Sequence, residues 1–311
     1  MVGMSSMRAT GDTRLPSMLM SLAAVLNVIL DPILIFGVGP VPAMGLNGAA
    51  MAALLARAAI FIGTLYLMRH RLDMVSFKKP DPGELRQSWR DILHVGIPAA
   101  GTNIIVPVGA TVVTAMIARF GPDAVAGFGV ASRIESMMLV MYYALSAIIG
   151  PFVGQNFSAG KEERILRALW LCTAFCLGSG LVIAGLLAWM SGWLPGLFSD
   201  SESVRQVTAM FLWIVPLSYG TYGMVMVMNA SFNGLGYPMP GVFISVSRIV
   251  VLYIPVALIA MQFFDIAGIF AAYAIANIVS GLGAYVWARN TVRNRCAEEA
   301  VLRKAAAEAR P

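Results

Sequence analysis

The chain has 311 residues, of which 59% are hydrophobic and 12% are charged, about half the charged fraction of an ordinary soluble domain. Its net charge of +6 could indicate nucleic-acid binding, but the basic residues stand beside apolar runs and not in a stripe with stacking aromatics. The composition therefore excludes an ordinary soluble domain. It predicts an all-α polytopic membrane protein with the lipid bilayer as a partner and no nucleic-acid partner.

Eight apolar runs, separated by polar loops, are long enough to cross a bilayer core about 30 Å thick. The predicted spans cover residues 15–37, 45–68, 92–119, 124–153, 165–194, 204–231, 240–263 and 266–289. Several exceed the minimum length, so we expect tilted or kinked helices. The candidate kink sites are Pro107, Pro151, Pro216 and Pro255.

The first span carries the sharpest candidate for a functional residue. Asp31 follows Asn27 by one helical turn, so the carboxylate and the amide share a helix face. A charged side chain at mid-helix costs about 2.5–3.5 kcal/mol on insertion scales, and Asp31 could offset that cost by exchanging a proton or by binding Na⁺. The alternative is a polar pair that caps a helix kinked at Pro32.

The longest polar segment divides the chain between its second and third spans. We interpret it as a cytoplasmic linker that faces anionic lipid. The predicted organisation is a partial N-terminal lobe of two spans over 1–69, the linker over 70–91, a C-terminal lobe of six spans over 92–292, and a cytoplasmic tail over 293–311.

Two charged residues stand in later spans. Glu135, in the fourth span, is a candidate second coupling acid, or else a hydrated charge near a helix end. Arg248, deep in the seventh span, needs either a partner or a water-filled face, so a structural pair and a place on the substrate path are both open. Asn277 is expected to join helices by hydrogen bonds.

Residues that would indicate enzymatic or metal chemistry are few. Cys172 and Cys176 lie one turn apart, but no further Cys or His joins them, so we expect inert packing. The two histidines, His70 and His94, lie at membrane edges, and no hydrolase or zinc-protease motif is present. We therefore expect neither an enzyme nor a bound cofactor.

Basic residues are distributed unevenly among the loops. If the segment before the first span is cytoplasmic, that side holds Arg8, Arg14, Arg69, Arg71, Lys78, Lys79, Arg86, Arg90, Lys161, Arg164, Arg167, Arg289, Arg293, Arg295, Arg303, Lys304 and Arg310. The opposite loops hold Arg119 and Arg205. The positive-inside rule therefore predicts that both termini are cytoplasmic.

The first two spans resemble the last two at one constant offset. The matched pairs are Gly11 with Gly234, Pro32 with Pro255, Gly45 with Gly268, Ala49 with Ala272, and Ala53 with Ala276. Four spans lie between the copies, so the repeat unit is six helices and the two lobes are parallel repeats. The second copy is complete, and this reasoning predicts that four further helices precede Met1.

Several motifs in this order resemble the multidrug and toxic compound extrusion (MATE) family over nearly the whole chain. They are RATGDTR over 8–14 with Pro16, NVILDP over 27–32 with IFG over 35–37, Gly96-Ile97-Pro98, AGFGVASRIE over 126–135, and Gly154-Gln155-Asn156 with Gly160. By this resemblance the spans correspond to the family's fifth to twelfth helices.

The resemblance implies a monomeric transporter in a bacterial-type plasma membrane, with two six-helix lobes around a central cavity. It would export small molecules, often organic cations, in exchange for H⁺ or Na⁺. The family's cation site combines a first-helix Asp, an Asn-x-x-x-Asp pair that Asn27 and Asp31 match, and a sixth-helix hydroxyl. This sequence lacks the first-helix Asp, and the hydroxyl position falls near Ala49, so the site is incomplete and its ion is open. No metal beyond Na⁺ at Asp31 is expected.

The main alternative function is a flippase for lipid-linked saccharides or lipids, since a related fold could serve it. A cavity lined by several arginines would favour the flippase over a cation exporter. Arg248 alone does not decide between them.

Overall fold

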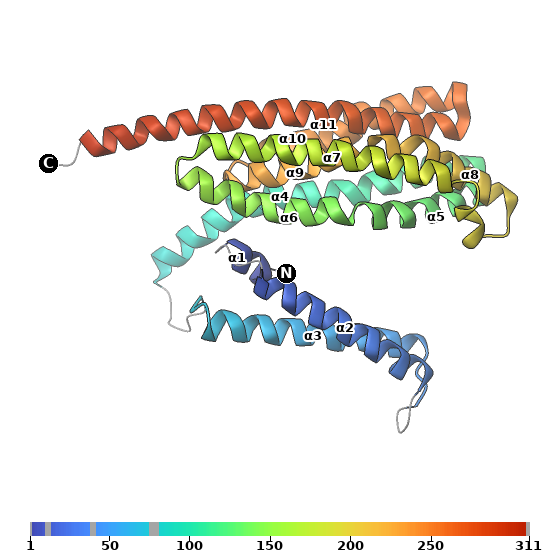
Figure 1. The fold of residues 1–311 in the computed structure, drawn as a ribbon, viewed down its shortest axis with the longest axis horizontal. Helices are drawn as coiled ribbons and strands as arrows, with labels where there is room; N and C mark the ends of the chain where they lie inside the picture. Colours follow the sequence, from blue (N-terminus) through green and yellow to red (C-terminus); the bar gives the residue numbers. More distant parts are fainter. Residues whose placement is uncertain (1, 10–13, 38–41, 75–80, 309–311) are drawn as a thin grey trace. The chain divides into compact units, whose positions relative to one another are not determined.

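The computed structural model describes residues 2–9, 14–37, 42–74 and 81–308 (Figure 1). In these ranges the chain forms helices joined by turns and contains no strand, which confirms the predicted all-α class. It divides into two compact units, Met1–Leu85 and Arg86–Pro311. The division falls inside the predicted linker.

The first unit is built around a helical hairpin. It contains α1 (Val2–Ala9), α2 (Arg14–Phe36) and α3 (Leu46–His70). The hairpin closes where the backbone N–H groups of Met44 and Gly45 donate to the carbonyls of Leu34 and Ile35, at 3.0 and 3.1 Å. These helices confirm the first two predicted spans.

The second unit begins within α4 (Pro82–Ile117), so part of the predicted linker is helical. A proline is tolerated in the first turn of a helix, and the backbone N–H of Gly83 donates to the Asp81 side chain there at 3.3 Å. The Lys78-Lys79-Pro80 part of the linker lies outside the described residues.

The second unit continues through a series of helices that Figure 1 shows lying roughly along one direction. They are α5 (Pro122–Met138), α6 (Val140–Ser158), α7 (Glu162–Met190), α8 (Glu202–Ile214), α9 (Tyr219–Gly234), α10 (Met239–Val246) and α11 (Ile254–Glu308). Short 3₁₀ helices lie at Ala118–Phe120, Leu194–Leu197 and Val215–Ser218. A π-helical segment at Ser247–Tyr253 joins α10 to α11.

The predicted kink sites are partly confirmed. Pro216 lies in the tight turn between α8 and α9, as expected for a proline kink. Pro151 lies inside α6, where a kink stays a prediction, and a 43° bend of the span occurs between α5 and α6, around Leu139. At this bend α5 ends at its C-cap residue Leu139, whose backbone N–H donates to the carbonyls of Glu135 and Met137.

The last two predicted spans form a second hairpin, whose first arm is α10, the π-helical segment and the start of α11, and whose turn lies inside α11. Asp265 interrupts the helix with a non-helical φ of 50° and ψ of −132°, and a side chain at Gly268 would meet the carbonyl of Ala260. Gly45 adopts nearly the same angles, 54° and −128°, before α3. The two hairpins therefore share a turn geometry.

This shared geometry corrects the register of the predicted repeat. Gly48 packs against the carbonyl of Leu34 as Gly268 packs against that of Ala260. Counting from the two turns, Gly48 corresponds to Gly268, and Ala52, which is fully buried, corresponds to Ala272. The sequence comparison paired Gly45 with Gly268, because each is a glycine close to its hairpin turn. In the structure, Gly45 matches Asp265 in its backbone angles, so the pairing is shifted by three residues.

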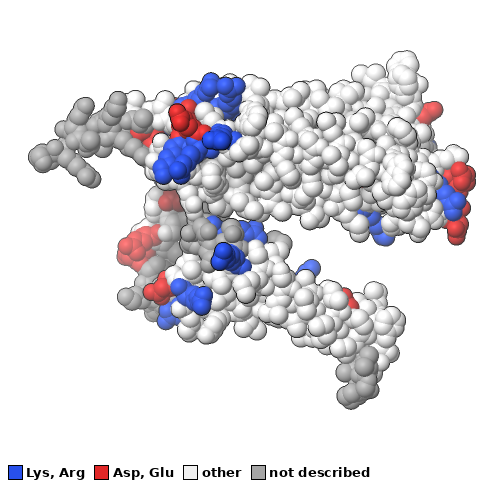
Figure 2. Space-filling model, viewed as in Figure 1, with Lys and Arg blue, Asp and Glu red and all other residues white. Residues whose placement is uncertain are grey.

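Five helices of the described residues are long and apolar enough to cross a bilayer, or six when α5 and α6 count as one bent span. This number treats Met239–Glu299 as one helix and does not include α4, so the eight-span arrangement stays a prediction. In the second unit, Figure 2 shows charged residues gathered mainly toward two ends, with a broad uncharged surface between them. Such a belt is typical of a membrane protein.

The core of the second unit is organised around α9. Most of its residues are buried, and it packs against α6, α7 and α11. Glycines permit the closest approach: a side chain at Gly180 on α7 would lie 2.5 Å from the backbone nitrogen of Gly220 on α9. Small residues at such contacts are the usual means of helix packing in membranes.

Candidate functional site

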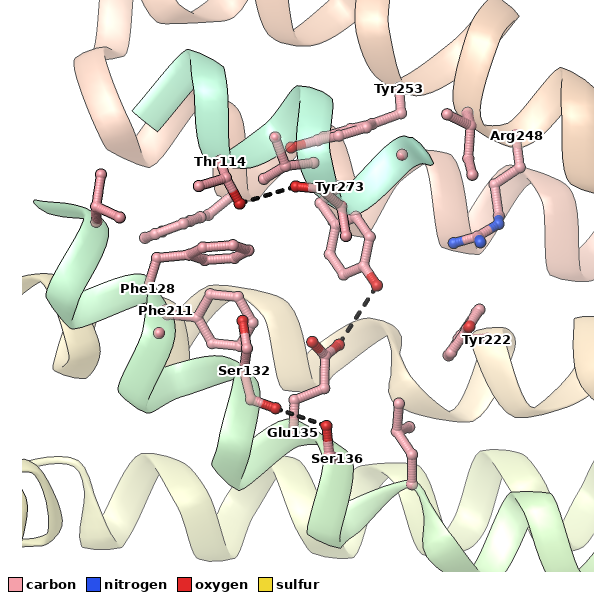
Figure 3. Close-up of a pocket in the computed structure, with 18 of the residues that line it drawn as sticks. Thr114, Phe128, Ser132, Glu135, Ser136, Phe211, Tyr222, Arg248, Tyr253 and Tyr273 are labelled. Atoms are coloured by element: carbon pink, nitrogen blue, oxygen red, sulfur yellow. Dashed lines mark hydrogen bonds between the residues drawn. The ribbon is translucent and has the colours of Figure 1, made fainter. Parts of the chain in front are cut away.

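A cavity of about 470 Å³ lies within the second unit (Figure 3). Residues of α4, α5, α6, α8, α9, the π-helical segment and α11 line it. Its volume falls in the range of about 300–1,000 Å³ that is common for small-molecule sites. All of the lining residues belong to the second unit.

One side of the cavity is a cluster of aromatic rings. Phe128 on α5 stacks against Phe270 on α11, with ring centroids 6.4 Å apart, and Phe211 on α8 meets Phe270 edge to face at 5.1 Å. Tyr253 and Tyr273 form a further edge-to-face pair at 5.4 Å. Figure 3 shows Phe128 and Phe211 on one side of Glu135 and the hydroxyl of Tyr273 pointing toward its carboxylate. The wall therefore offers flat apolar faces with polar phenol tips.

Glu135 lies in the last turn of α5, just before the bend at Leu139. Its side chain points into the cavity, and the hydroxyl of Tyr273 donates to its Oε1 at 3.4 Å. Glu135 therefore lies near a helix end, at the break in a bent span, and also lines the cavity, so both predicted roles stay open.

Arg248 lies in the π-helical segment and is only 4% exposed. Its Nη1 donates to Oδ1 of Asn277 at 2.8 Å, and its guanidinium lies 4.7 Å from the centroid of the Tyr222 ring. Asn277 in turn donates to the hydroxyl of Ser218 at 3.1 Å. Asn277 thus joins helices as predicted, and Arg248 both has a structural partner and lines the cavity.

The two charged groups of the cavity interact at a distance. Within the described residues, no carboxylate lies within 4.0 Å of the Arg248 guanidinium, whose Nε also has no hydrogen-bond partner. The hydroxyl of Tyr253, 3% exposed, likewise has none. The cavity therefore contains a carboxylate, a guanidinium and a phenol whose bonding capacity is incompletely used.

In the first unit, Asn27 and Asp31 share one face of α2, as predicted. The Nδ2 of Asn27 lies 3.5 Å from Oδ1 of Asp31, and both side chains are half-buried. Ala49, the position where the resemblance implies a hydroxyl, lies in the first turns of α3. The described residues hold no cluster of three or more His, Cys, Asp or Glu side chains that could bind a metal ion.

The sequence reasoning missed the aromatic part of the cavity. Tyr222, Tyr253 and Tyr273 were not singled out, although a phenol hydroxyl inside an apolar span needs a polar partner, which is a usable signal. Met224 and Met228 of α9 are buried in the core of the second unit.

Comparison with known proteins identifies the family of the chain. The family model MatE matches residues 98–259, which contain most of the cavity. The chain belongs to the MatE family. The resemblance noted in the sequence is therefore confirmed.

Individual MatE relatives match over most of this chain. A "FAD transporter" of Shewanella oneidensis is 36% identical, and the match covers 93% of this chain and 64% of that protein. A probable multidrug resistance protein NorM of Thermotoga maritima is 26% identical over 88% of this chain and 59% of its own length. The chain therefore spans less than two thirds of these relatives.

Solved structures agree with the fold. The crystal structure of the Vibrio cholerae MATE transporter VcmN in a mutant form superposes with a TM-score of 0.84 at 30% sequence identity. The match covers 93% of this chain and 64% of that one.

Proposed function

We propose that the protein is a secondary active antiporter that exports organic compounds in exchange for H⁺ or Na⁺ by alternating access. Membership of the MatE family supports this proposal, as do relatives named as multidrug resistance proteins and as a FAD transporter. No step of covalent chemistry is required, so the protein acts as a transporter and not as an enzyme.

The single observation that carries the proposal is the cavity among the helices of the second unit. It is large enough for a drug-sized compound, is walled by aromatic rings, and contains one acid and one base. Ionisable residues inside apolar helices typically mark substrate or ion pathways, because their burial needs a compensating role. We assign substrate binding to this cavity, with Glu135 and Arg248 on the substrate path.

We assign ion coupling to Asp31, with Asn27 orienting its carboxylate. The pair lies on a span where a carboxylate is costly, and a coupling acid must either change its charge state or bind a cation. Glu135 is the proposed second coupling acid, since it shares the cavity with the proposed substrate. The same groups could serve H⁺ or Na⁺.

The flippase alternative is less well supported. It calls for several arginines around the cavity, whereas Arg248 is the one basic residue among the described side chains that line it. We further propose a monomer in a bacterial-type plasma membrane with both termini in the cytoplasm, which the uneven distribution of Lys and Arg among the loops supports.

The test is transport into or out of proteoliposomes under an imposed H⁺ or Na⁺ gradient. The wild-type protein at full length, with the four further helices that the repeat predicts, should move a fluorescent organic compound against its own gradient, and an ionophore that collapses the ion gradient should stop it. Asp31→Asn should abolish this gradient-driven movement while leaving compound binding largely intact, because the amide keeps the volume and most hydrogen bonds but cannot exchange charge. Glu135→Gln should impair transport less, since the Asn-x-x-x-Asp pattern is the more specific coupling signal.

A matched control is Asp73→Asn, which makes the same change at an exposed residue beyond the end of α3. It should transport at the wild-type rate. Equal rates in wild-type protein and Asp31→Asn, at matched protein levels, would contradict the coupling role of Asp31.

A further inference from the structure

The guanidinium of Arg248 is a buried charge that contacts neutral groups. It is 4% exposed, its Nη1 donates to the neutral amide oxygen of Asn277, and it lies over the ring of Tyr222. A buried charge without a paired countercharge is strongly unfavourable, and the Nε of Arg248 also has no acceptor. Because Arg248 lines the cavity, a molecule bound there could place a negatively charged group beside its guanidinium.

The remaining groups of the cavity describe what that occupant looks like. Phe128, Phe211 and Phe270 form a cluster of interacting rings beside the cavity. Phe211 and Phe270 are buried, and the partly exposed ring of Phe128 is the one against which a flat aromatic system could stack. Tyr253 lines the same cavity as Arg248, while its hydroxyl oxygen is buried and has no hydrogen-bond partner.

Glu135 interacts with the positive charge of Arg248 across the cavity but makes no direct ion pair with it. Its carboxylate accepts from Tyr273, and no ion pair within 4.0 Å joins the two charged residues. Figure 3 shows Tyr222, and not Glu135, beside the Arg248 guanidinium. The forked donors of a guanidinium match the oxygens of a carboxylate or a phosphate, so an anionic group is the complement that this position lacks.

We propose that this cavity binds flat aromatic compounds that carry an anionic group, with Arg248 holding the anion and the aromatic wall holding the ring. The proposal rests on the proposed function in using the same cavity as the substrate site, and it narrows the substrate class away from organic cations. Arg248 is then a specificity-determining residue. Asn277 is a positioning residue that holds the guanidinium in place through its 2.8 Å bond.

The test is equilibrium binding of four fluorescent naphthalene probes to the purified protein in detergent, with no ion gradient. The probes share one ring system: naphthoate and naphthyl phosphate are anionic, naphthamide is neutral, and naphthylmethylammonium is cationic. We expect the better of the two anions to bind at least about thirtyfold more tightly than the cation, and its identity separates carboxylate from phosphate as the preferred group.

Substitutions at Arg248 test whether its charge binds the anionic group of the probe. Arg248→Gln should weaken binding of that anion at least about thirtyfold while leaving naphthamide binding nearly unchanged, and Arg248→Lys should recover part of the loss. Naphthamide binding also reports that the variant is folded. The control Arg167→Gln makes the same substitution at an exposed position of α7, outside the cavity, and should bind all four probes as the wild-type protein does.

Cation binding as tight as anion binding, or full anion affinity in Arg248→Gln, would overturn the proposal. These results are separable from a failure of the proposed function, because binding is measured without a gradient. If anion selectivity were present while gradient-driven transport was absent, the antiporter proposal would fail and the present one would stand.

Discussion

At the residue scale, the chain combines local pairs that can be read from the sequence with contacts that cannot. The Asn27 and Asp31 pair was predictable because residues one turn apart on a helix face each other whatever the tertiary fold. The contact of Tyr273 with Glu135 joins residues 138 positions apart, so only the packing of α11 against α5 brings them together. The contact of Arg248 with Asn277 likewise depends on how the helices pack.

The bond between Arg248 and Asn277 gives a prediction about stability. Asn277→Ala removes the acceptor of a fully buried network and leaves both Arg248 and Ser218 without this partner. We expect the free energy of unfolding to fall by about 1–2 kcal/mol, as for other interhelical hydrogen bonds in membranes. The measurement is the unfolding midpoint of the detergent-solubilised protein.

Asn290→Ala is the matched control, because Asn290 lies on the same helix α11 but is exposed. Its unfolding midpoint should stay at the wild-type value. A midpoint for Asn277→Ala as high as that of the control would show that the network does not stabilise the fold.

At the element scale, glycines decide how closely α7 and α9 approach. Gly180→Ala would place a methyl group 2.5 Å from the backbone nitrogen of Gly220, where neither backbone can yield easily. Overpacking of this kind typically costs about 1–3 kcal/mol, so we expect a lower unfolding midpoint. Gly185→Ala on the same helix meets no atom within 4 Å and should be neutral. If both variants unfolded alike, the close crossing of the two helices would be wrong.

The elements themselves were largely predictable, whereas their interruptions were not. Apolar runs longer than about 20 residues predict helices regardless of context, and α2, α3 and α7 lie close to the predicted ranges. No proline lies near the bend at Leu139, so the sequence does not indicate it. The π-helical segment at Ser247–Tyr253 lies within a largely apolar run that gives no sign of a change in helix type. The turn at Asp265 likewise depends on a single residue with a positive φ.

At the scale of the whole molecule, the distribution of charge predicts the orientation of the second unit. In a variant without the native cysteines, Ala159→Cys should react with a membrane-impermeant thiol reagent only from the cytoplasmic side, because Lys161, Arg164 and Arg167 follow it. Asp200→Cys, at an exposed loop position, should react only from outside. Labelling of intact cells and of inverted vesicles makes the comparison, and reaction of both positions from the same side would contradict the orientation.

The central claim is that the cavity of the second unit is the substrate site, and blocking it is the most direct test. Gly129 lines the cavity, and a side chain built there meets no atom within 4 Å, so Gly129→Phe should fill the space without disturbing the fold. Gly178→Phe is the control, since Gly178 is exposed on α7 and has equal room.

The measurement is gradient-driven transport by the two variants and the wild-type protein in proteoliposomes at matched protein levels. We expect Gly129→Phe to lose transport and probe binding together, while Gly178→Phe retains both. Wild-type transport by Gly129→Phe would contradict this expectation.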